Sequence, residues 1–327
     1  MDGELSRLVA AQRGFFFRSQ ALDCGYSPQE ISELLRTRAW VRIRHGAYAP
    51  AELVADASAA ARHLLVVRAA VAKLAGQVVV THVSGLAALD VPLWGVDLGQ
   101  VHVHRDAERS SRREAGIVHH SGALPDSQII EVHGLLVAIP ERSALDACRT
   151  ERFEAGVVLM DGARRLSRFD DENARQILEQ QRDWHGSVRA SRVLAFSDPR
   201  AQTVGESRTR VLMARIGLPK PDLQHHVHDS TGRLVGITDL YIDEIVTAVE
   251  FDGRLKYGRE LYERSGKPDQ VDIGEVVWRE KLREDAIRDE GNEMVRIVWH
   301  ELDGHDRMVA QRFDRAATRS QRGRRAG

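Results

Sequence analysis

The sequence has few of the features that mark secreted, membrane-spanning or disulfide-stabilised proteins. Its 327 residues include only two cysteines, Cys24 and Cys148, which lie far apart and form no CxxC motif. This content is typical of buried thiols in a reducing compartment. No run approaches the roughly 20 apolar residues that a membrane span needs, and the first residues lack the apolar core of a secretory signal. We therefore expect a soluble, cytoplasmic protein with no membrane partner.

An excess of charge of one sign is also missing. The 47 basic and 48 acidic side chains give a formal net charge of −1. Any surface for nucleic acid must therefore come from local clusters of arginine. Apolar residues make up 43% of the chain and charged residues 29%, which are globular proportions. The length predicts two or three domains. The helix and strand patterns described below predict that the multidomain protein is of the α/β class.

The first fifty residues predict a winged helix-turn-helix domain. The segment "SPQEISELLR" begins with Ser27 as N-cap and Pro28 at the first helical position, and Glu30 completes a capping box. A short helix from about Ser19 to Gly25 precedes it, so the two form a helix-turn-helix pair. A basic hairpin follows in "RTRAWVRIRHGAYAP".

The arginines around this hairpin are the candidate DNA contacts. The alternation from Val41 to Arg44 places Arg42 and Arg44 on one face of a strand, and Arg36 and Arg38 lie just before it. Such arginines would neutralise phosphates, while side chains near the start of the second helix would meet base edges in the major groove. The alternative is a small helical module with a solvated arginine face. The pattern favours DNA binding.

Residues 51–200 predict a middle α/β domain. An alanine-rich helix at about 54–75, a helix with Ser84 as N-cap and a helix after Pro140 alternate with short strands. Five histidines lie on or beside these strands: His102, His104, His119, His120 and His133. Their spacing matches no zinc-binding pattern, and histidines that alternate along strands are typical of half-exposed sheet positions. The sequence favours that role over a metal site.

Residues 201–318 predict a compact α/β domain, and residues 319–327 predict a basic tail. The boundary before this domain is expected in "FSDPRAQTVGES", where Pro, Asp, Ser and Gly gather. The expected order is helix, three strands, helix, strand. The strands "RLVGITDLYI" and "EIVTAVEFD" are apolar on both faces, as expected for strands covered by helices.

Acidic residues lie near the ends of these two strands. A turn at residues 243–244 would set Glu250 opposite Ile237, with Asp239 diagonal to it. Because side chains alternate along a strand, Asp239, Glu250 and Asp252 then project from one face. Three carboxylates at one spot repel one another unless a cation neutralises them, and oxygen ligands of this kind select Mg²⁺ or Mn²⁺. The pattern predicts a metal site.

Further residues would complete a hydrolytic site around the metal, which would activate water and stabilise charge on a phosphate. Lys256, after the turn, would assist, and Lys281 on the next helix is an alternative lysine. Glu206 would add a fourth acid if its helix packs on this face, or would simply pair with Arg210 at i+4. The alternative for the whole cluster is a strand end whose acids pair with arginines, namely Arg254, Arg279 or Arg283.

Two family resemblances rest on these motifs. The segments "GESRTR", "QHHVHDSTGRLVGITD", "VEFDGRLKYG" and "REKLREDAIRDEGNEMVRIVW" together resemble a PD-(D/E)XK nuclease domain similar to very-short-patch-repair endonucleases, a restriction-endonuclease-like αβββαβ fold. The N-terminal half, with "GYSPQEISELLRTRAWVRIRHGAYA", "THVSGLAALDVPLW" and "IPERSALD", resembles AbiEi-type antitoxins or regulators of type IV toxin-antitoxin systems. Together the resemblances cover most of the chain.

The first resemblance implies roles for individual residues. Asp239 and Glu250 match the two metal-binding acids, and Glu206 matches the helix acid that orients a water or a second ion. The family's lysine normally follows the second acid by two residues, where this chain has Asp252. Asp252 would then be an accessory ligand or position a water, and Lys256 would stabilise charge from a displaced position.

These observations lead to two expectations. The first is a DNA-binding protein with a Mg²⁺-dependent endonuclease domain that hydrolyses phosphodiester bonds. The second is a non-catalytic transcriptional regulator or antitoxin, with a toxin as partner, whose nuclease-like domain is a scaffold. Hydrolysis of RNA fits the same chemistry, because metal-carboxylate catalysis does not by itself choose the sugar.

Overall fold

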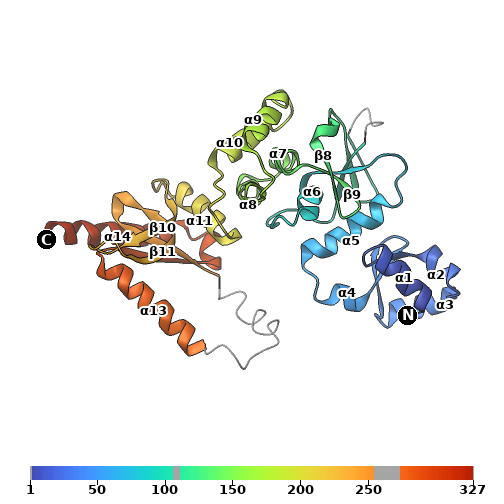
Figure 1. The fold of residues 1–327 in the computed structure, drawn as a ribbon, viewed down its shortest axis with the longest axis horizontal. Helices are drawn as coiled ribbons and strands as arrows, with labels where there is room; N and C mark the ends of the chain where they lie inside the picture. The colour runs from blue at the N-terminus through green and yellow to red at the C-terminus, as the bar shows by residue number, and fades with distance from the viewer. Residues whose placement is uncertain (1, 106–110, 254–272, 327) are drawn as a thin grey trace. The chain divides into compact units, whose positions relative to one another are not determined.

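The computed structural model describes residues 2–105, 111–253 and 273–326. The chain forms two compact units, Met1–Ser197 and Asp198–Gly327. Its architecture is mixed α/β with more than one domain, and the described residues form three separate sheets (Figure 1). No helix among these residues is both long and apolar enough to cross a membrane.

The N-terminal part of the first unit contains short helices and a three-stranded sheet in the order β1-β3-β2. The bounds are α1 Gly3–Ala11, β1 Phe16–Phe17, α2 Arg18–Asp23, α3 Pro28–Arg36, β2 Trp40–Arg44 and β3 Ala47–Pro50. Helix α3 begins at Pro28 as predicted, because the Ser27 amide donates to Glu30 Oε2 at 2.8 Å and the Ser27 hydroxyl accepts from the Glu30 amide at 3.2 Å. Helix α2 ends before Gly25, whose φ of +90° suits glycine. The predicted helix pair and hairpin are confirmed as local structure.

A six-stranded sheet and the helices around it make up the rest of the first unit. The bounds are α4 Ala51–Ala55, α5 Ala59–Val71, β4 Val79–Val80, α6 His82–Ala88, β5 Val101–His104, β6 Arg112–Glu114, β7 Ile117–His120, β8 Ile129–Val132, β9 Leu135–Ala138, α7 Pro140–Thr150, α8 Phe153–Arg164, α9 Asp171–Gln180 and α10 Ser187–Phe196. The strand order is β6-β7-β5-β4-β9-β8, with β5 parallel to β7 and β4 parallel to β9. Helices α7 to α10 pack together beside this sheet (Figure 1).

Two predictions for this region are wrong. The helix expected at about 54–75 is two helices, because Ser58 caps the start of α5 with its hydroxyl. Ser84 is not an N-cap, since Thr81 holds that position. The Ser84 hydroxyl lies inside α6, 2.9 Å from His63 Nε2. A tertiary hydrogen bond, which sequence pattern cannot show, therefore accounts for this serine.

The second unit has the predicted order of helix, three strands, helix and strand, followed by a final helix. The bounds are α11 Val204–Arg215, β10 Asp222–His228, β11 Leu234–Ile242, β12 Thr247–Asp252, α13 Ile273–Asp289, β13 Glu293–Val298 and α14 Asp306–Ala326. Strands β10, β11 and β12 form an antiparallel meander, and β13 joins β12 in parallel. The parallel pair is possible because the crossover between β12 and β13 contains α13.

The two faces of this sheet have separate cores. Leu240 and Val249 point to the face that packs against α11 and α14. Tyr241 and Ala248 point to the opposite face, where Ile287 of α13 covers them. Both faces are therefore buried, which explains why these strands are apolar at successive positions.

The turn between β11 and β12 is longer than predicted. Leu240 pairs with Val249, so residues 243–246 connect the strands instead of the predicted pair 243–244. The last residue of this loop has a φ of +47°, which reverses the chain without a glycine signal. The register moves by two residues and keeps its parity, so Asp239 and Glu250 still share a face, as predicted. Asp239 comes level with Glu250 instead of diagonal to it.

Most of the C-terminal residues, which were predicted to form a basic tail, belong to a helix. Helix α14 continues to Ala326 and includes most of residues 319–327. Arg319 Nη2 lies 2.7 Å from Glu293 Oε2 at the start of β13, which ties this part of the helix to the sheet. The arginines there are also good helix formers, so local propensity and a tertiary ion pair act together.

Candidate functional site

A pocket of about 180 Å³ lies at the end of β12. Its lining residues are Asp239, Glu250, Phe251, Asp252, Gly253, Arg283 and Arg296. The pocket therefore brings together three of the acids that the sequence singled out, and adds two arginines, of which only Arg283 was named, as an ion-pair alternative. It lies on the face of the sheet that α13 covers.

The sheet register and one glycine position these charges. Glu250 pairs with Arg296 across the parallel β12–β13 ladder, so the two side chains share the face. Arg283 comes from α13, which approaches β11 closely at Gly236. A Cβ atom at Gly236 would lie 3.1 Å from Ile287 Cδ1 and 3.3 Å from Arg283 Cγ. The lack of a side chain there lets α13 bring Arg283 over the acids.

Glu250 is buried, with 6% of the residue exposed, and is held by arginine. Arg283 Nη2 lies 2.8 Å from Glu250 Oε1, and Arg283 Nη1 donates to the Ile237 carbonyl at 2.7 Å. Arg296 Nη2 lies 3.9 Å from the other oxygen, Glu250 Oε2. A buried carboxylate needs such partners, because an uncompensated charge in this position would be strongly destabilising.

The other two acids are held less directly. Asp239 Oδ2 accepts a hydrogen bond from the Phe251 amide at 2.9 Å, which orients its carboxylate across the two strands. Asp252 Oδ2 lies 3.7 Å from Arg296 Nη1. Arg296 also binds Glu284 of α13 at 2.9 Å, so its guanidinium is shared between the strand acids and the helix. The pocket is a network of alternating charges.

The carboxylates of the pocket are ligands of the type that a hard divalent cation prefers. Three carboxylates supply oxygen ligands, which Mg²⁺ prefers. The lining acids outnumber the lining arginines by three to two, so the described lining carries a formal excess of negative charge. Arg283 already engages one oxygen of Glu250, so an ion and this guanidinium would compete for that carboxylate. The metal assignment stays a prediction.

Glu206 and the lysines lie outside this arrangement. Glu206 is buried and does not line the pocket. Its carboxylate accepts hydrogen bonds from the Gln202 amide at 2.8 Å, the Thr203 hydroxyl at 2.9 Å and Gln224 Nε2 at 3.2 Å, which is the pattern of a helix cap. Lys281 is exposed on α13 and is not a lining residue. Lys256 lies outside the described residues.

The predicted DNA-binding arginines do not form one face. Arg42 pairs with Tyr48 and Arg44 with Ala47, so a bulge in β2 turns Arg42 and Arg44 to opposite sides. Arg42 is exposed, whereas Arg44 Nη2 donates to the Ala115 carbonyl at 3.2 Å. The prediction of a shared face is therefore wrong.

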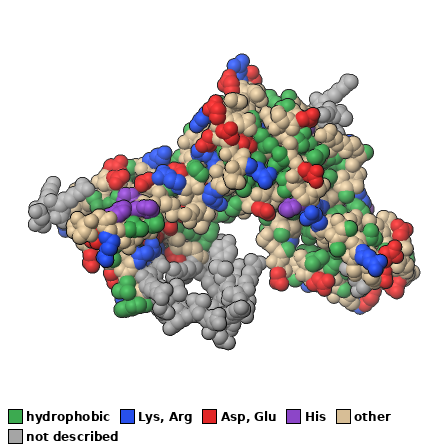
Figure 2. Space-filling model, in the orientation of Figure 1, with side chains coloured by type: hydrophobic (Ala, Val, Ile, Leu, Met, Phe, Trp, Pro, Cys, Tyr) green, Lys and Arg blue, Asp and Glu red, His purple; other side chains and the backbone are tan. Residues whose placement is uncertain are grey.

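The two arginines before the hairpin remain on the surface. Arg38 is exposed, and Arg36 is exposed while paired with Glu33 at 2.6 Å on α3. On the face shown in Figure 2, acidic and basic side chains of the described residues are mixed. The candidate DNA contacts near the hairpin are therefore individual exposed arginines.

Sequence reasoning missed a group of histidines. His82, His102 and His120 each offer a ring nitrogen, and these atoms all lie within 4.8 Å of one another. The sequence pattern singles out His102 and His120 as strand histidines but gives no reason to add His82. The signal available was the parallel pairing of "VHVH" with "IVHH", which places His102 and His120 on one face. His82, which comes from α6, joins them only through the tertiary fold.

Comparison with known proteins gives a distant similarity. No protein-family model matches the chain. Two curated proteins from strains of Mycobacterium tuberculosis, named uncharacterized protein Rv2248 and uncharacterized protein MT2308, are each 31% identical to it over 108 residues. The match covers 33% of this chain and 40% of each relative, so the chain matches less than half of their length. This similarity assigns no family and no activity.

Proposed function

We propose that this protein binds DNA through its N-terminal helices and hairpin and hydrolyses DNA phosphodiesters in its C-terminal unit with Mg²⁺ or Mn²⁺. The observation that carries the proposal is the meeting of Asp239, Glu250 and Asp252 in one pocket with Arg283 and Arg296. Acids from neighbouring strands next to guanidinium groups supply both a cation site and contacts for phosphate.

The proposal includes the finer folds. The N-terminal helix pair with its hairpin is taken as a winged helix, and the unit with order α11, β10, β11, β12, α13, β13 as a PD-(D/E)XK domain. The order of elements and the place of the acids on two adjacent strands support the second assignment. The AbiEi-like segments support a regulator-like first unit. A cytoplasmic location belongs to the same proposal.

The chemistry follows from the side chains of the pocket. Asp239 and Glu250 would hold Mg²⁺, which supplies an activated water and stabilises developing charge when bound. The Phe251 amide fixes the orientation of Asp239 before any ligand arrives. Arg283, released from Glu250, and Arg296 would bind the phosphate oxygens. Asp252 would position the attacking water.

Replacement of Asp239 tests this proposal. Asp239→Asn keeps the size of the side chain and removes its charge, so we expect metal-dependent cleavage of plasmid DNA to fall at least about 100-fold, as for loss of a major electrostatic group. Asp243→Asn is the matched control, because Asp243 is an exposed acid in the adjoining turn. Equal cleavage by Asp239→Asn and the parent protein would overturn the assignment.

Two observations favour a second function. The 2.8 Å ion pair between Arg283 and Glu250 already satisfies the buried acid, and Asp252 occupies the position of the family's lysine. Both facts suit a non-catalytic regulator or antitoxin whose C-terminal unit is a scaffold, with a toxin as partner. This alternative predicts DNA binding that does not depend on Mg²⁺ and no loss of intact DNA in any divalent metal.

A further inference from the structure

Three histidines from separate elements of the first unit meet at one point. His82 begins α6, His102 lies on β5 and His120 ends β7. The rings of His82 and His120 are stacked with centroids 3.7 Å apart, and His102 Nδ1 lies 3.0 Å from His120 Nε2. Clustering of imidazoles in this way is unfavourable whenever they are charged, so the arrangement needs a reason.

The backbone at His82 is in an unusual conformation. Its φ is +52°, in the left-handed region that few non-glycine residues adopt. Such a conformation costs free energy and clusters at functional sites. It lies at the first residue of α6, directly after the N-cap Thr81. The conformation therefore brings the side chain of His82 to the other two histidines at an energetic cost.

One nitrogen of His82 has a partner and the other has none among the described residues. His82 Nδ1 lies 3.0 Å from the Thr81 hydroxyl, while Nε2 is buried and without a hydrogen bond. The residue is only 2% exposed. If Nδ1 donates to Thr81, Nε2 carries a lone pair. A second-sphere hydrogen bond on one ring nitrogen and a free lone pair on the other is the usual state of a metal-binding histidine.

The imidazoles are also in the protonation state that binds metals. Burial, with His102 beside it, lowers the pKa of His120 to about 3, and burial lowers the pKa of His102 to about 4. Burial lowers the pKa of His82 as well, with the neighbouring histidines adding to the effect. Burial therefore favours the neutral imidazole, which is the ligand form.

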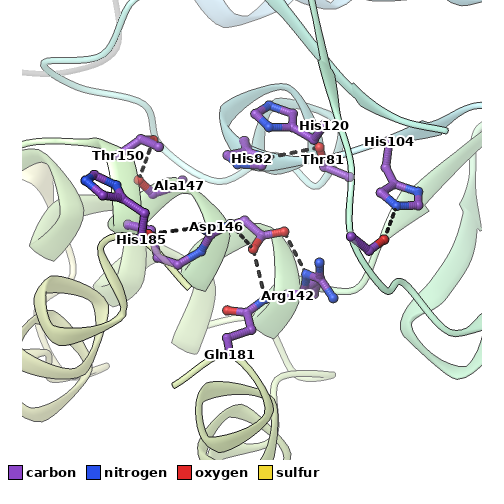
Figure 3. A network of polar contacts seen from close by, with 12 residues as sticks. Thr81, His82, His104, His120, Arg142, Asp146, Ala147, Thr150, Gln181 and His185 are labelled. Atoms are coloured by element: carbon purple, nitrogen blue, oxygen red, sulfur yellow. Dashed lines mark hydrogen bonds and ion pairs between the residues drawn. The ribbon is translucent and has the colours of Figure 1, made fainter. Parts of the chain in front are cut away.

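His82 and His120 border a large cavity in the first unit. A pocket of about 570 Å³ is lined by His82, His120, Arg142, Asp146, Arg149 and Trp184, among others. Arg142 and Arg149 both bind Asp146, at 2.7 Å and 2.9 Å, and both guanidinium groups lie 5.0 Å from the Trp184 ring centroid. Figure 3 shows Asp146 between the two histidines and Arg142, with its carboxylate bound to Arg142 and Gln181.

This pocket collects motifs that the nuclease proposal does not use. Thr81 and His82 come from "THVSG", His120 from "IVHH" and Arg142, Asp146 and Arg149 from "PERSALDACR". The Nε atom of Arg149 is buried and has no hydrogen-bond partner among the described residues. Residues from separate chain segments therefore meet at one cavity, and two of them, His82 and Arg149, also carry a buried nitrogen without a hydrogen bond among the described residues.

We propose that His82, His102 and His120 bind one divalent transition-metal ion, Zn²⁺ foremost, with a further coordination position on the side of the Arg142–Asp146 pocket. Three imidazoles with an open position are a known donor set for zinc, whereas carboxylates suit Mg²⁺. Tetrahedral zinc places its nitrogen ligands roughly 3.3 Å apart. The nitrogens lie within 4.8 Å, so rotation of the side chains brings them into range.

Metal titration of the full-length chain tests the proposal. The protein is first dialysed against a chelator, and Zn²⁺ is then titrated calorimetrically, with Co²⁺ in a second sample as a spectroscopic probe. We expect one high-affinity Zn²⁺ per chain at the histidines, and the visible absorption bands of Co²⁺ held by nitrogen ligands. The variant His102→Gln with His120→Gln should weaken Zn²⁺ binding by more than about 100-fold, beyond the roughly 10–100-fold typical of second-sphere changes.

Two controls separate the possible results. His104→Gln removes a buried histidine of the same strand whose Nε2 contacts the Gly122 carbonyl at 2.7 Å, and should leave zinc binding unchanged. Glu250→Gln removes the carboxylate site proposed for the second unit, so the Zn²⁺ that this variant still binds belongs to the histidines, which makes failure here distinguishable from failure of the nuclease proposal. Circular dichroism establishes that each variant is folded. A parent protein that binds no Zn²⁺, or a folded double variant that binds it as tightly as the parent, would overturn the proposal.

Thr81 provides a finer test as a positioning residue. Its side chain makes no capping hydrogen bond to α6, so Thr81→Val leaves the helix start intact and removes only the contact with His82 Nδ1. We expect zinc affinity to fall about 10-fold with an unchanged melting temperature of the metal-free protein. Unchanged zinc affinity would show that Thr81 does not position His82 for the metal.

Discussion

Glu250 is the residue at which the catalytic and the scaffold hypotheses differ. Its buried carboxylate has Arg283 at 2.8 Å, and a divalent ion would need the same oxygen. In Arg283→Met the carboxylate is deprived of its main partner, so we expect the free energy of unfolding to fall by about 1–3 kcal/mol. The side chain of Arg283 is 34% exposed and Arg296 remains nearby, which keeps the effect below that of a fully buried pair.

Chemical unfolding with and without Mg²⁺ measures this effect. If the pocket is a metal site, Mg²⁺ should stabilise Arg283→Met more than the parent protein, because the ion takes the place of the guanidinium. Arg288→Met is the matched control on the same helix, since Arg288 is 46% exposed and pairs with Glu284 and Asp285 of that helix at 3.6 Å and 3.7 Å. If Mg²⁺ stabilises the parent protein and Arg283→Met equally, Glu250 does not bind the metal.

At the scale of elements, the close contact of α11 with β12 holds the C-terminal unit together. A Cβ atom at Gly205 would lie 1.9 Å from Phe251 Cε1, a distance that no packed structure tolerates. We expect Gly205→Ala to lower the free energy of unfolding by about 1–3 kcal/mol or more, as the helix or the ring must move. Gly3→Ala is the control, because a Cβ at Gly3 meets nothing within 4 Å. Thermal unfolding compares the two, and equal melting temperatures would contradict this packing.

The start of α3 was predictable because its signal is local. Ser27, Pro28 and Glu30 lie within four residues and form the capping box that the sequence indicates. The shared face of Asp239 and Glu250 was predictable as well, since alternation depends only on parity. The register was not, because residues 243–246 turn without glycine.

Features that depend on distant parts of the chain could not be read from the sequence. The sequence offers Arg283 as one of several possible partners for the acids. Only the position of α13 over the sheet shows that Arg283 binds Glu250. The bulge that separates Arg42 from Arg44 has no sequence signal in a run that alternates regularly. His82 joins His120 only because β5 and β7 pair in parallel and α6 begins beside them.

At the scale of the whole molecule, the near-zero net charge makes local arginines decisive for nucleic-acid binding. With a formal charge of −1, the chain has no overall attraction for a polyanion. Arg38 and Arg42 are exposed next to the hairpin, so Arg38→Ala with Arg42→Ala should weaken DNA binding and reduce the salt dependence of log K by about 1.8, or about 0.9 for each phosphate that an arginine no longer neutralises. Fluorescence anisotropy at several salt concentrations measures this slope.

The control for that experiment is an exposed arginine elsewhere in the first unit. Arg175 on α9 has a side chain that is 64% exposed and pairs with Glu172 at 3.1 Å. Arg175→Ala should leave both affinity and salt slope unchanged. The same slope for all three proteins would place the DNA-binding surface away from the hairpin.

The most direct test of the proposed nuclease site is isothermal titration of Mg²⁺ into the full-length parent protein and into Glu250→Gln. Glutamine keeps the shape of Glu250 and removes the charge that the ion needs. The proposed site predicts that the parent binds Mg²⁺ and that the folded variant does not. If the parent binds no Mg²⁺, or if both proteins bind it equally, the carboxylates of β11 and β12 do not form a metal site, and their pairing with Arg283 and Arg296 is structural.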